Sequence, residues 1–245
     1  MNTFADSLAT AFQLITSLDP LLWSVVARSL AVSATACAMA YGLGVLLGAW
    51  LAVARFVGRA GVLLILNTLL ALPSVVVGLV VYLLLSRTGP LGALGWLFSF
   101  KAMVVAQFIL VLPIVTALTR QVVEDVERQH GEQWASLGAG PVLRGLLLAW
   151  DERLALLTIA VAAFGRAISE VGAVMIVGGN IDGFTRVMTT AIALETSKGD
   201  LPLALALGLM LLAVVGLLNL AVAALRRWGE KRQGMVLTAP KGWVV

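Results

Sequence analysis

Residues 130–141 read HGEQWASLGAGP and form a polar break between two long apolar stretches of a chain of 245 residues. Gly131 predicts a turn before a short helix, and Gly138 with Pro141 predicts the end of that helix. The segment around this break, residues 119–153, has about 35 residues, whereas connections between neighbouring helices usually have about two to eight. Such a length indicates a folded unit outside the apolar spans. An ordinary interfacial loop with a glycine-terminated helix is the simpler alternative.

The composition is that of an integral membrane protein. Hydrophobic residues make up 60% of the chain and charged residues 12%, with a mean hydropathy of +1.00, whereas soluble domains average about 25% charged residues. Apolar runs of about 20 residues recur, which is long enough for helices that cross a bilayer and too long for barrel strands. We therefore expect an all-α, polytopic helical membrane protein. Its five predicted transmembrane helices cover residues 30–54, 61–85, 99–118, 154–177 and 201–225.

The distribution of basic residues predicts the orientation. Of the 17 Lys and Arg residues, eleven fall on the side that includes segment 119–153, five fall on the opposite side, and Arg166 lies within a span. Because Lys and Arg resist translocation, we expect an external N-terminus and a cytoplasmic C-terminus. We divide the chain into an N-terminal interfacial segment (1–28), a transmembrane domain (29–225) and a basic cytoplasmic tail (226–245).

The sequence lacks the residues that a disulfide, a metal site, a catalytic site or a nucleotide-binding loop would require. Cys37 is the single cysteine and His130 the single histidine, so we expect no internal disulfide, metal site or catalytic residue. An intramembrane hydrolase would need a nucleophile and a base at bilayer depth. No phosphate-binding loop of the form Gly-x-x-x-x-Gly-Lys-Ser/Thr occurs, so nucleotide must be bound elsewhere. The net charge of +4 belongs to the cytoplasmic face and does not indicate nucleic-acid binding.

The polar break resembles the cytoplasmic loop of the permease subunits of ATP-binding-cassette importers. That loop has the pattern Glu-Ala-Ala-x-x-x-Gly, and here EQWASLG places Glu132 and Gly138 at the matching offset. Gln133 and Trp134 replace the two alanines, and LAWDER replaces the apolar-Leu-Pro ending of the family.

The resemblance extends over residues 25–225. Residues 66–92 and 164–195 look like segments of the oxyanion-importing branch, which handles tungstate, molybdate and sulfate, and the second segment looks most like the tungstate permeases.

The resemblance implies a type I importer permease, with a cytoplasmic coupling helix, in a prokaryotic inner membrane. It implies a homodimer with two ATPase subunits, which bind ATP and Mg, and an extracytoplasmic binding protein. The chain would be a transport subunit rather than an enzyme. Its substrate would be a tetrahedral oxyanion, tungstate first, then molybdate or sulfate. An ion-coupled secondary anion transporter or a channel without an ATPase is the alternative. The implied coupling residues are Glu132, Gln133, Trp134, Ser136, Leu137, Gly138 and Ala139.

Polar groups inside the spans are the candidates for a translocation pathway or gate. Arg166 and Glu170 are four residues apart in the fourth span, so they share a helical face and can pair. An unpaired Arg at mid-bilayer costs about 2.5–3.5 kcal/mol, so neither residue should face lipid. Pro73 should kink or unwind the second span, and with Ser74 it is our candidate for the constriction; Ser169 completes the set. The sequence does not decide between a gating role and a packing role for these residues.

Three local patterns complete the expectations. Gly44 and Gly48 form a small-xxx-small pair, which suits close helix approach either within the subunit or at the dimer seam. Residues 177–180, VGGN, predict the outer end of the fourth span. Apolar positions between residues 4 and 18 recur at helical spacing and predict a short interfacial helix.

Overall fold

The computed structural model describes residues 4–17, 19–136 and 138–237. In chain order these residues form α1 (Phe4–Thr16), α2 (Pro20–Val53), α3 (Arg59–Leu70), α4 (Ser74–Leu85), the 3-10 turn η1 (Gly92–Leu94), α5 (Phe100–Ser136), α6 (Pro141–Asp151), α7 (Arg153–Ile168), α8 (Gly172–Gly178), α9 (Met188–Lys198) and α10 (Leu201–Leu237). No strand occurs within the described ranges, and the predicted all-α fold class is confirmed.

Three unbroken helices and two bent pairs are long and apolar enough to cross a membrane. The unbroken ones are α2, α5 and α10, and the pairs are α3 with α4, bent by 101°, and α7 with α8, bent by 57°. With each pair counted as one span, the five predicted spans are all present. The first begins at Pro20 rather than at residue 30. The Asp19 carboxylate accepts the N–H groups of Leu21 (2.9 Å) and Leu22 (3.0 Å), which starts the helix early.

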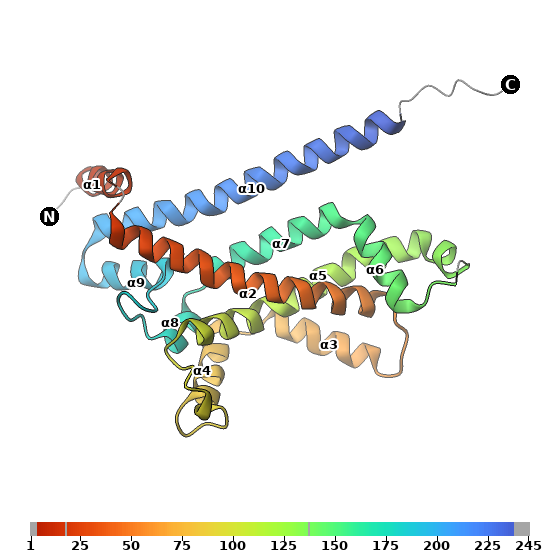
Figure 1. Ribbon diagram of the computed structural model, residues 1–245, viewed down its shortest axis with the longest axis horizontal. Helices are drawn as coiled ribbons and strands as arrows, with labels where there is room; N and C mark the ends of the chain where they lie inside the picture. The colour runs from red at the N-terminus through yellow and green to blue at the C-terminus, as the bar shows by residue number, and fades with distance from the viewer. Residues whose placement is uncertain (1–3, 18, 137, 238–245) are drawn as a thin grey trace.

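The connections between the spans gather at the two ends of an elongated bundle (Figure 1). One end carries α1, α9 and the segment between α4 and α5. The other end carries the α2–α3 turn, the connection from α5 to α6, and the C-terminal part of α10. The segments that we predicted to share the cytoplasmic face therefore do lie at one end. Of the predicted cytoplasmic tail, the backbone of residues 226–237 continues α10, and residues 238–245 lie outside the described part of the chain.

The bundle is built around α5. Of its most apolar 18-residue stretch 67% is buried, compared with 17% for α10, so α5 is central and α10 peripheral. Glycines bring α2 close to α5, because a Cβ on Gly44 would lie 2.9 Å from the Cβ of Val115, and one on Gly48 would lie 2.6 Å from the Thr116 carbonyl oxygen. The Gly44/Gly48 pair thus serves packing within the subunit, which decides between the two alternatives left open by the sequence.

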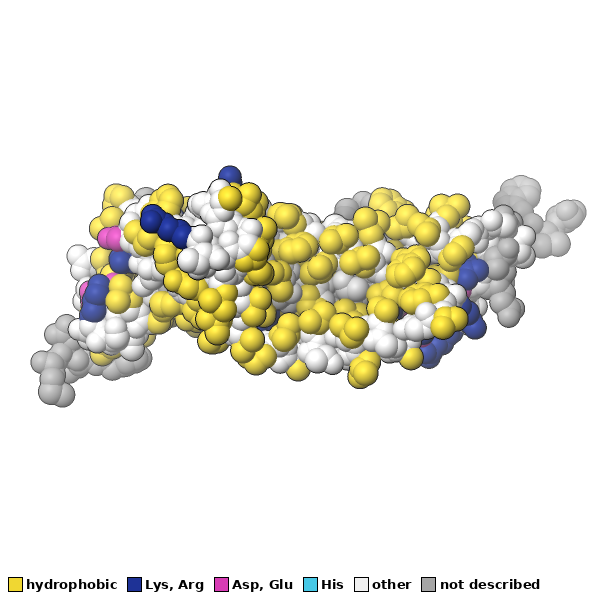
Figure 2. All heavy atoms as spheres, turned by 90° about the horizontal axis from the view of Figure 1, so that it is seen from below, with side chains coloured by type: hydrophobic (Ala, Val, Ile, Leu, Met, Phe, Trp, Pro, Cys, Tyr) yellow, Lys and Arg dark blue, Asp and Glu magenta, His cyan; other side chains and the backbone are white. Residues whose placement is uncertain are grey.

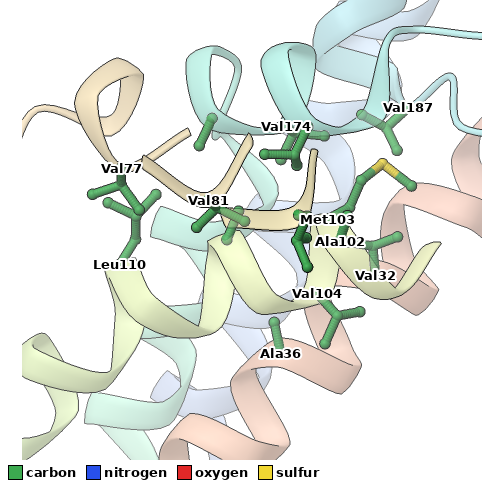
Figure 3. Packing of buried hydrophobic residues seen from close by; sticks show 14 residues of the cluster. Val32, Ala36, Val77, Val81, Ala102, Met103, Val104, Leu110, Val174 and Val187 are labelled. Carbon is green, nitrogen blue, oxygen red and sulfur yellow. The ribbon is translucent and has the colours of Figure 1, made fainter. Parts of the chain in front are cut away.

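The second halves of the two broken spans share a hydrophobic core with α2 and α5 (Figure 3). Val81 of α4, Val174 of α8, Met103 of α5 and Val32 of α2 all belong to this buried cluster. The predicted N-terminal helix is confirmed as α1, and its buried Ala11 packs in another cluster with side chains of α10.

Candidate functional site

The segment that resembles a coupling loop forms a helical hairpin from the end of α5 and α6. Gly138, at φ +78°, adopts the left-handed conformation predicted for a turn at this glycine. The N–H of Ala139 donates to the Trp134 carbonyl (3.2 Å), which is the bond that closes a Schellman motif at a helix end. Pro141 then occupies the first position of α6, where a backbone N–H would have no partner within the helix, so its absence in proline costs no hydrogen bond.

The predicted turn at Gly131 is wrong, because α5 continues through it to Ser136. The backbone of Glu132 and Gln133 lies in α5, and no separate short helix begins there. Two contacts explain the continuation. The Trp134 side chain packs against the core between α2 and α5, and a Cβ on Gly131 would lie 2.6 Å from the Glu127 carboxyl carbon, so the glycine makes room for that side chain. Of the remaining implied coupling residues, Ser136 is exposed, Ala139 is half-buried, and Leu137 lies outside the described residues.

The short helix of the hairpin is α6, and it is held firmly against the bundle. A Cβ on Gly145 would lie 2.5 Å from the carbonyl oxygen of Ala49, so the α6 backbone touches that of α2. Arg144 forms an ion pair with Glu127 of α5 (2.9 Å), and both side chains are largely buried. Leu148 is fully buried beneath the helix. A force on α6 therefore acts on both α2 and α5.

The outer face of α6 is apolar and largely exposed in this subunit, although the Arg153 guanidinium lies over the Trp150 ring, 5.9 Å from its centroid. Val142, Leu143, Leu146 and Trp150 are all exposed, and Trp150 is 70% exposed. Val142, Leu146 and Trp150 recur at a spacing of four residues and Leu143 lies three residues before Leu146, so all four form one stripe along the helix. We did not single them out from the sequence, although an apolar repeat after a helix-starting proline was the available signal.

Charged side chains brace the base of the hairpin. Glu124 of α5 forms ion pairs with Arg59 of α3 (3.6 Å), with Arg128 (3.5 Å) and with Arg120. Since Arg59 begins α3, this network ties the second span to the hairpin.

The predicted pathway residues lie at the two helix breaks. Pro73 immediately precedes α4 in an extended conformation, and α3 and α4 meet here at 101°. The predicted interruption at Pro73 is thereby confirmed. The second break, between α7 and α8, was not predicted, because residues 169–171 contain neither Pro nor Gly. The predicted stop after the fourth span is confirmed, since α8 ends at Gly178 and Gly179 has φ +71°.

Glu170 is the centre of a polar cluster at these breaks. Its side chain is 4% exposed, and its Oε2 accepts from Nη1 of Arg166 at 2.7 Å. Its Oε1 accepts the N–H of Ala173 (3.1 Å) in the first turn of α8, and the Ser74 hydroxyl of α4 also hydrogen-bonds to the carboxylate. The Ser169 hydroxyl donates to the Arg166 carbonyl (3.1 Å). The structure thus brings residues from both breaks to one place.

Two side chains that we did not predict support the backbone at the second break. The Thr189 hydroxyl donates to the Glu170 carbonyl (2.7 Å), and Nε2 of Gln107 donates to the Ala167 carbonyl (2.9 Å). Unpaired backbone groups at bilayer depth are tolerated only where protein or water satisfies them. The available sequence signal was a Gln inside the apolar third span; the burial of Gln107 and Thr189 is visible only in the structure.

The segments after the two breaks cross with their backbones in contact. A Cβ on Gly78 of α4 would lie 2.7 Å from the Cα of Ala173, and one on Gly172 would lie 2.7 Å from Cγ2 of Val75. These two glycines therefore permit the crossing of α4 and α8 that places Ser74 beside Glu170.

Arg166 differs from its partner in burial. Its side chain is 43% exposed, whereas that of Glu170 is almost fully buried. The guanidinium therefore opens onto space that this subunit does not fill.

Comparison with known proteins identifies the family of this chain. No family model matches it. It is 39% identical to the tungstate uptake system permease protein TupB of Peptoclostridium acidaminophilum, over 92% of this chain and 99% of that protein. The chain belongs to the permease family of ATP-binding-cassette oxyanion importers. The permease is also 43% identical to TupB of Campylobacter jejuni over 67% of this chain and 69% of that protein. With the molybdenum transport system permease protein ModB of Escherichia coli K12 it shares 31% identity over 73% of this chain and 82% of that protein.

The α5–α6 hairpin and the polar cluster at the helix breaks both belong to a permease subunit. Permease subunits are not themselves catalytic, so the permease is a transport component rather than an enzyme. Its hairpin and its helix breaks are distinct sites, and α5 belongs to both, through Trp134 at one and Gln107 at the other.

Proposed function

We propose that the chain is the permease subunit of an ATP-driven tungstate importer. Its relatives from two bacteria are tungstate uptake permeases, and the molybdate permease is more distant. The observation that carries the proposal is the α5–α6 hairpin, with its exposed apolar stripe at the end of the bundle that holds most of the basic residues. Molybdate and sulfate are the next substrates in order.

The hairpin end is the cytoplasmic end of the bundle. Arg55, Arg59, Arg120, Arg128, Arg144 and Arg153 belong to the segments at this end. Lys and Arg are enriched in cytoplasmic segments near the membrane. The N-terminus then lies outside, near α1 and α9, where an extracytoplasmic binding protein would deliver the anion.

A separate ATPase docks on the hairpin and supplies the energy. The stripe of Val142, Leu143, Leu146 and Trp150 offers an exposed apolar helix face of the kind that lies in a hydrophobic groove of a partner. The implied coupling residues Glu132 and Gly138 belong to the same hairpin by their backbone. ATP and Mg belong to that partner, since the chain has no phosphate-binding loop.

Two copies of the chain form the path, with the cluster around Glu170 as its gate. The 43% exposure of Arg166 is incompatible with lipid contact at bilayer depth, and a second copy or a water-filled path would cover it. A permanently free arginine would hold an oxyanion too tightly, because conduction requires weak sites. The carboxylate of Glu170 neutralises the guanidinium in this closed pairing, which supports a gating role over a binding role.

The docking role is tested by copurification with the ATPase. Leu143→Ser and Trp150→Ser should reduce retention of the ATPase on the tagged permease, since each places a hydroxyl in the apolar stripe. Leu217→Ser is the matched control, because Leu217 of α10 is equally apolar and 67% exposed. Undiminished ATPase retention in both stripe variants would contradict the docking surface. Uphill tungstate uptake by vesicles that contain the permease alone would contradict the ATP-driven function and favour a secondary transporter.

A further inference from the structure

An apolar groove lies between α2, α3 and α5 on the surface of the bundle. Its volume is about 370 Å³, and its lining includes Trp50, Ile65, Leu69 and Phe108. Thr116 is the one lining residue with a hydroxyl group. That hydroxyl donates a hydrogen bond to the Leu112 carbonyl of its own helix (2.8 Å). The groove therefore offers a ligand almost nothing but hydrocarbon contact.

A charged pocket of about 320 Å³ adjoins the groove at the hairpin end of the same three helices. Arg55, Arg59 and Arg128 line it together with Glu124 and Glu127. The carboxylates are already engaged, because Glu124 pairs with three arginines and Glu127 pairs with Arg144. Arg55 forms no ion pair within the described part of the chain, and Arg128 is 72% exposed. The pocket thus keeps an excess of positive charge.

The two hollows are lined by consecutive residues of α2. Leu51 lines the groove and the next residue, Ala52, lines the charged pocket. The Arg59 guanidinium lies at the junction, where it donates to the Leu51 carbonyl from Nε (3.2 Å) and from Nη2 (3.1 Å). Trp50 stacks on Phe56 beside the junction, with ring centroids 5.2 Å apart. Aromatic side chains of this kind mark the level of the lipid headgroups.

Figure 2 shows a face of the molecule that is mostly apolar along its length and carries basic side chains toward its ends. Hydrophobic side chains cover most of its length. Lys and Arg side chains lie toward both ends, and one group of them lies at the end where Figure 1 places the α2–α3 turn.

We propose that this composite site binds an anionic phospholipid, with one acyl chain in the groove and the phosphate among the arginines. Arg favours phosphate because its planar N–H groups form paired hydrogen bonds with phosphate oxygens. Basic pockets between transmembrane helices bind anionic headgroups. A zwitterionic lipid would bring its cationic choline into a pocket that is already positive. The lipid would fill the space between α2 and α3, and α3, the first half of a broken span, packs mainly on α5.

Fluorescence quenching tests the proposal on the full-length protein, without any measurement of transport. Trp50 lines the groove, so phospholipid with brominated acyl chains should quench it, and the same titration of Trp50→Phe gives the contribution of the other tryptophans. Brominated phosphatidylglycerol should quench Trp50 at a mole fraction at least about tenfold lower than brominated phosphatidylcholine, since the nearby arginines attract an anionic headgroup.

Charge variants assign the headgroup position. The double variant Arg55→Gln/Arg128→Gln should abolish the preference for phosphatidylglycerol; both side chains are exposed, and Glu124 keeps its ion pairs with Arg59 and Arg120 when Arg128 is replaced. Arg227→Gln, an exposed arginine of α10, should retain the preference. Millimolar inorganic phosphate should leave the quenching unchanged, because it lacks the acyl chain.

Three results would overturn the proposal. Equal quenching by both lipids would show a groove without headgroup selection. Displacement by phosphate alone would show a simple anion pocket. The absence of Trp50 quenching by either lipid would show that a second copy of the chain, or the ATPase, covers the groove.

Discussion

Nη1 of Arg166 lies 2.7 Å from Oε2 of Glu170, although the helix that contains Arg166 ends at Ile168. The four-residue spacing of an intact helix is thus kept across a break in the fourth span. The same carboxylate also receives the N–H of Ala173 in α8. One side chain therefore holds together the two halves of the span and neutralises an intramembrane cation.

Charge neutralisation and helix capping by Glu170 can be separated. We predict that Arg166→Ala, Glu170→Gln and the double variant lose transport to the same extent, because each removes the one ion pair. Glu170→Ala should lose more and should also lower thermal stability, because it removes the acceptor of the Ala173 N–H. The measurements are tungstate uptake by reconstituted complexes and thermal unfolding in detergent. Additive losses in the Arg166→Ala/Glu170→Gln double variant would show that the two residues do not act as a unit.

The crossing of α4 and α8 should be intolerant of a methyl group at Gly78. In Gly78→Ala the new Cβ would lie 2.7 Å from the Cα of Ala173, so the two helices must separate. Overpacking of this kind costs about 1–3 kcal/mol, and we expect a thermal midpoint lower by several degrees. Gly165→Ala in α7 is the control. No atom lies within 4 Å of its added Cβ, and alanine favours a helix interior by about 1 kcal/mol relative to glycine. Equal stability of the two variants would refute the close crossing.

Gly138 should be required for its backbone conformation and not for its small size. Its φ of +78° disfavours side chains, yet no atom lies within 4 Å of an added Cβ. We predict that Gly138→Val weakens ATPase copurification several-fold, since the strained turn reorients α6. Gly138→Asn should retain most of it, because asparagine tolerates the left-handed region. A loss in Gly138→Asn as large as that in Gly138→Val would instead indicate that the partner needs a bare backbone at this position.

The backbone of the second break should depend on Thr189. Thr189→Val keeps the shape of the side chain and leaves the Glu170 carbonyl without the 2.7 Å bond from Oγ1. The loss of such a bond in a buried site costs about 1–3 kcal/mol, so the thermal midpoint should fall by a few degrees. Thr35→Val provides the control, because the exposed Thr35 hydroxyl donates only to the Ala31 carbonyl of its own helix. An unchanged midpoint for Thr189→Val would mean that water replaces the hydroxyl.

The features that the sequence predicted are those with a local physical cause. Apolar runs of bilayer length predicted the spans, and Pro73 predicted the first break because its ring excludes a continuous helix. Gly138 predicted the turn of the hairpin because a left-handed residue there ends α5. In each case the decisive interaction involves residues close together in the chain.

The features that the sequence did not predict depend on contacts between distant segments. The break at residues 169–171 is supported by Ser74, Gln107 and Thr189, which come from three other helices. Gly131 predicted a turn on local grounds, but packing of Trp134 and the reach of Glu127 to Arg144 keep α5 helical. Similarly, the exposed stripe of α6 becomes visible only when Leu148 on its other face is known to be buried.

The unbroken course of α5 determines how the hairpin and the second break are connected. From Phe100 to Ser136 the helix has 37 residues, which corresponds to about 55 Å at 1.5 Å per residue. Gln107 and Trp134 both lie on this one helix, about 40 Å apart. We therefore expect a rotation of α5 at the hairpin to move Gln107 as well and to alter its hydrogen bond to the Ala167 carbonyl. Pro113 lies between these two residues and removes one backbone hydrogen bond from the helix. The helix α5 therefore bends most easily at Pro113.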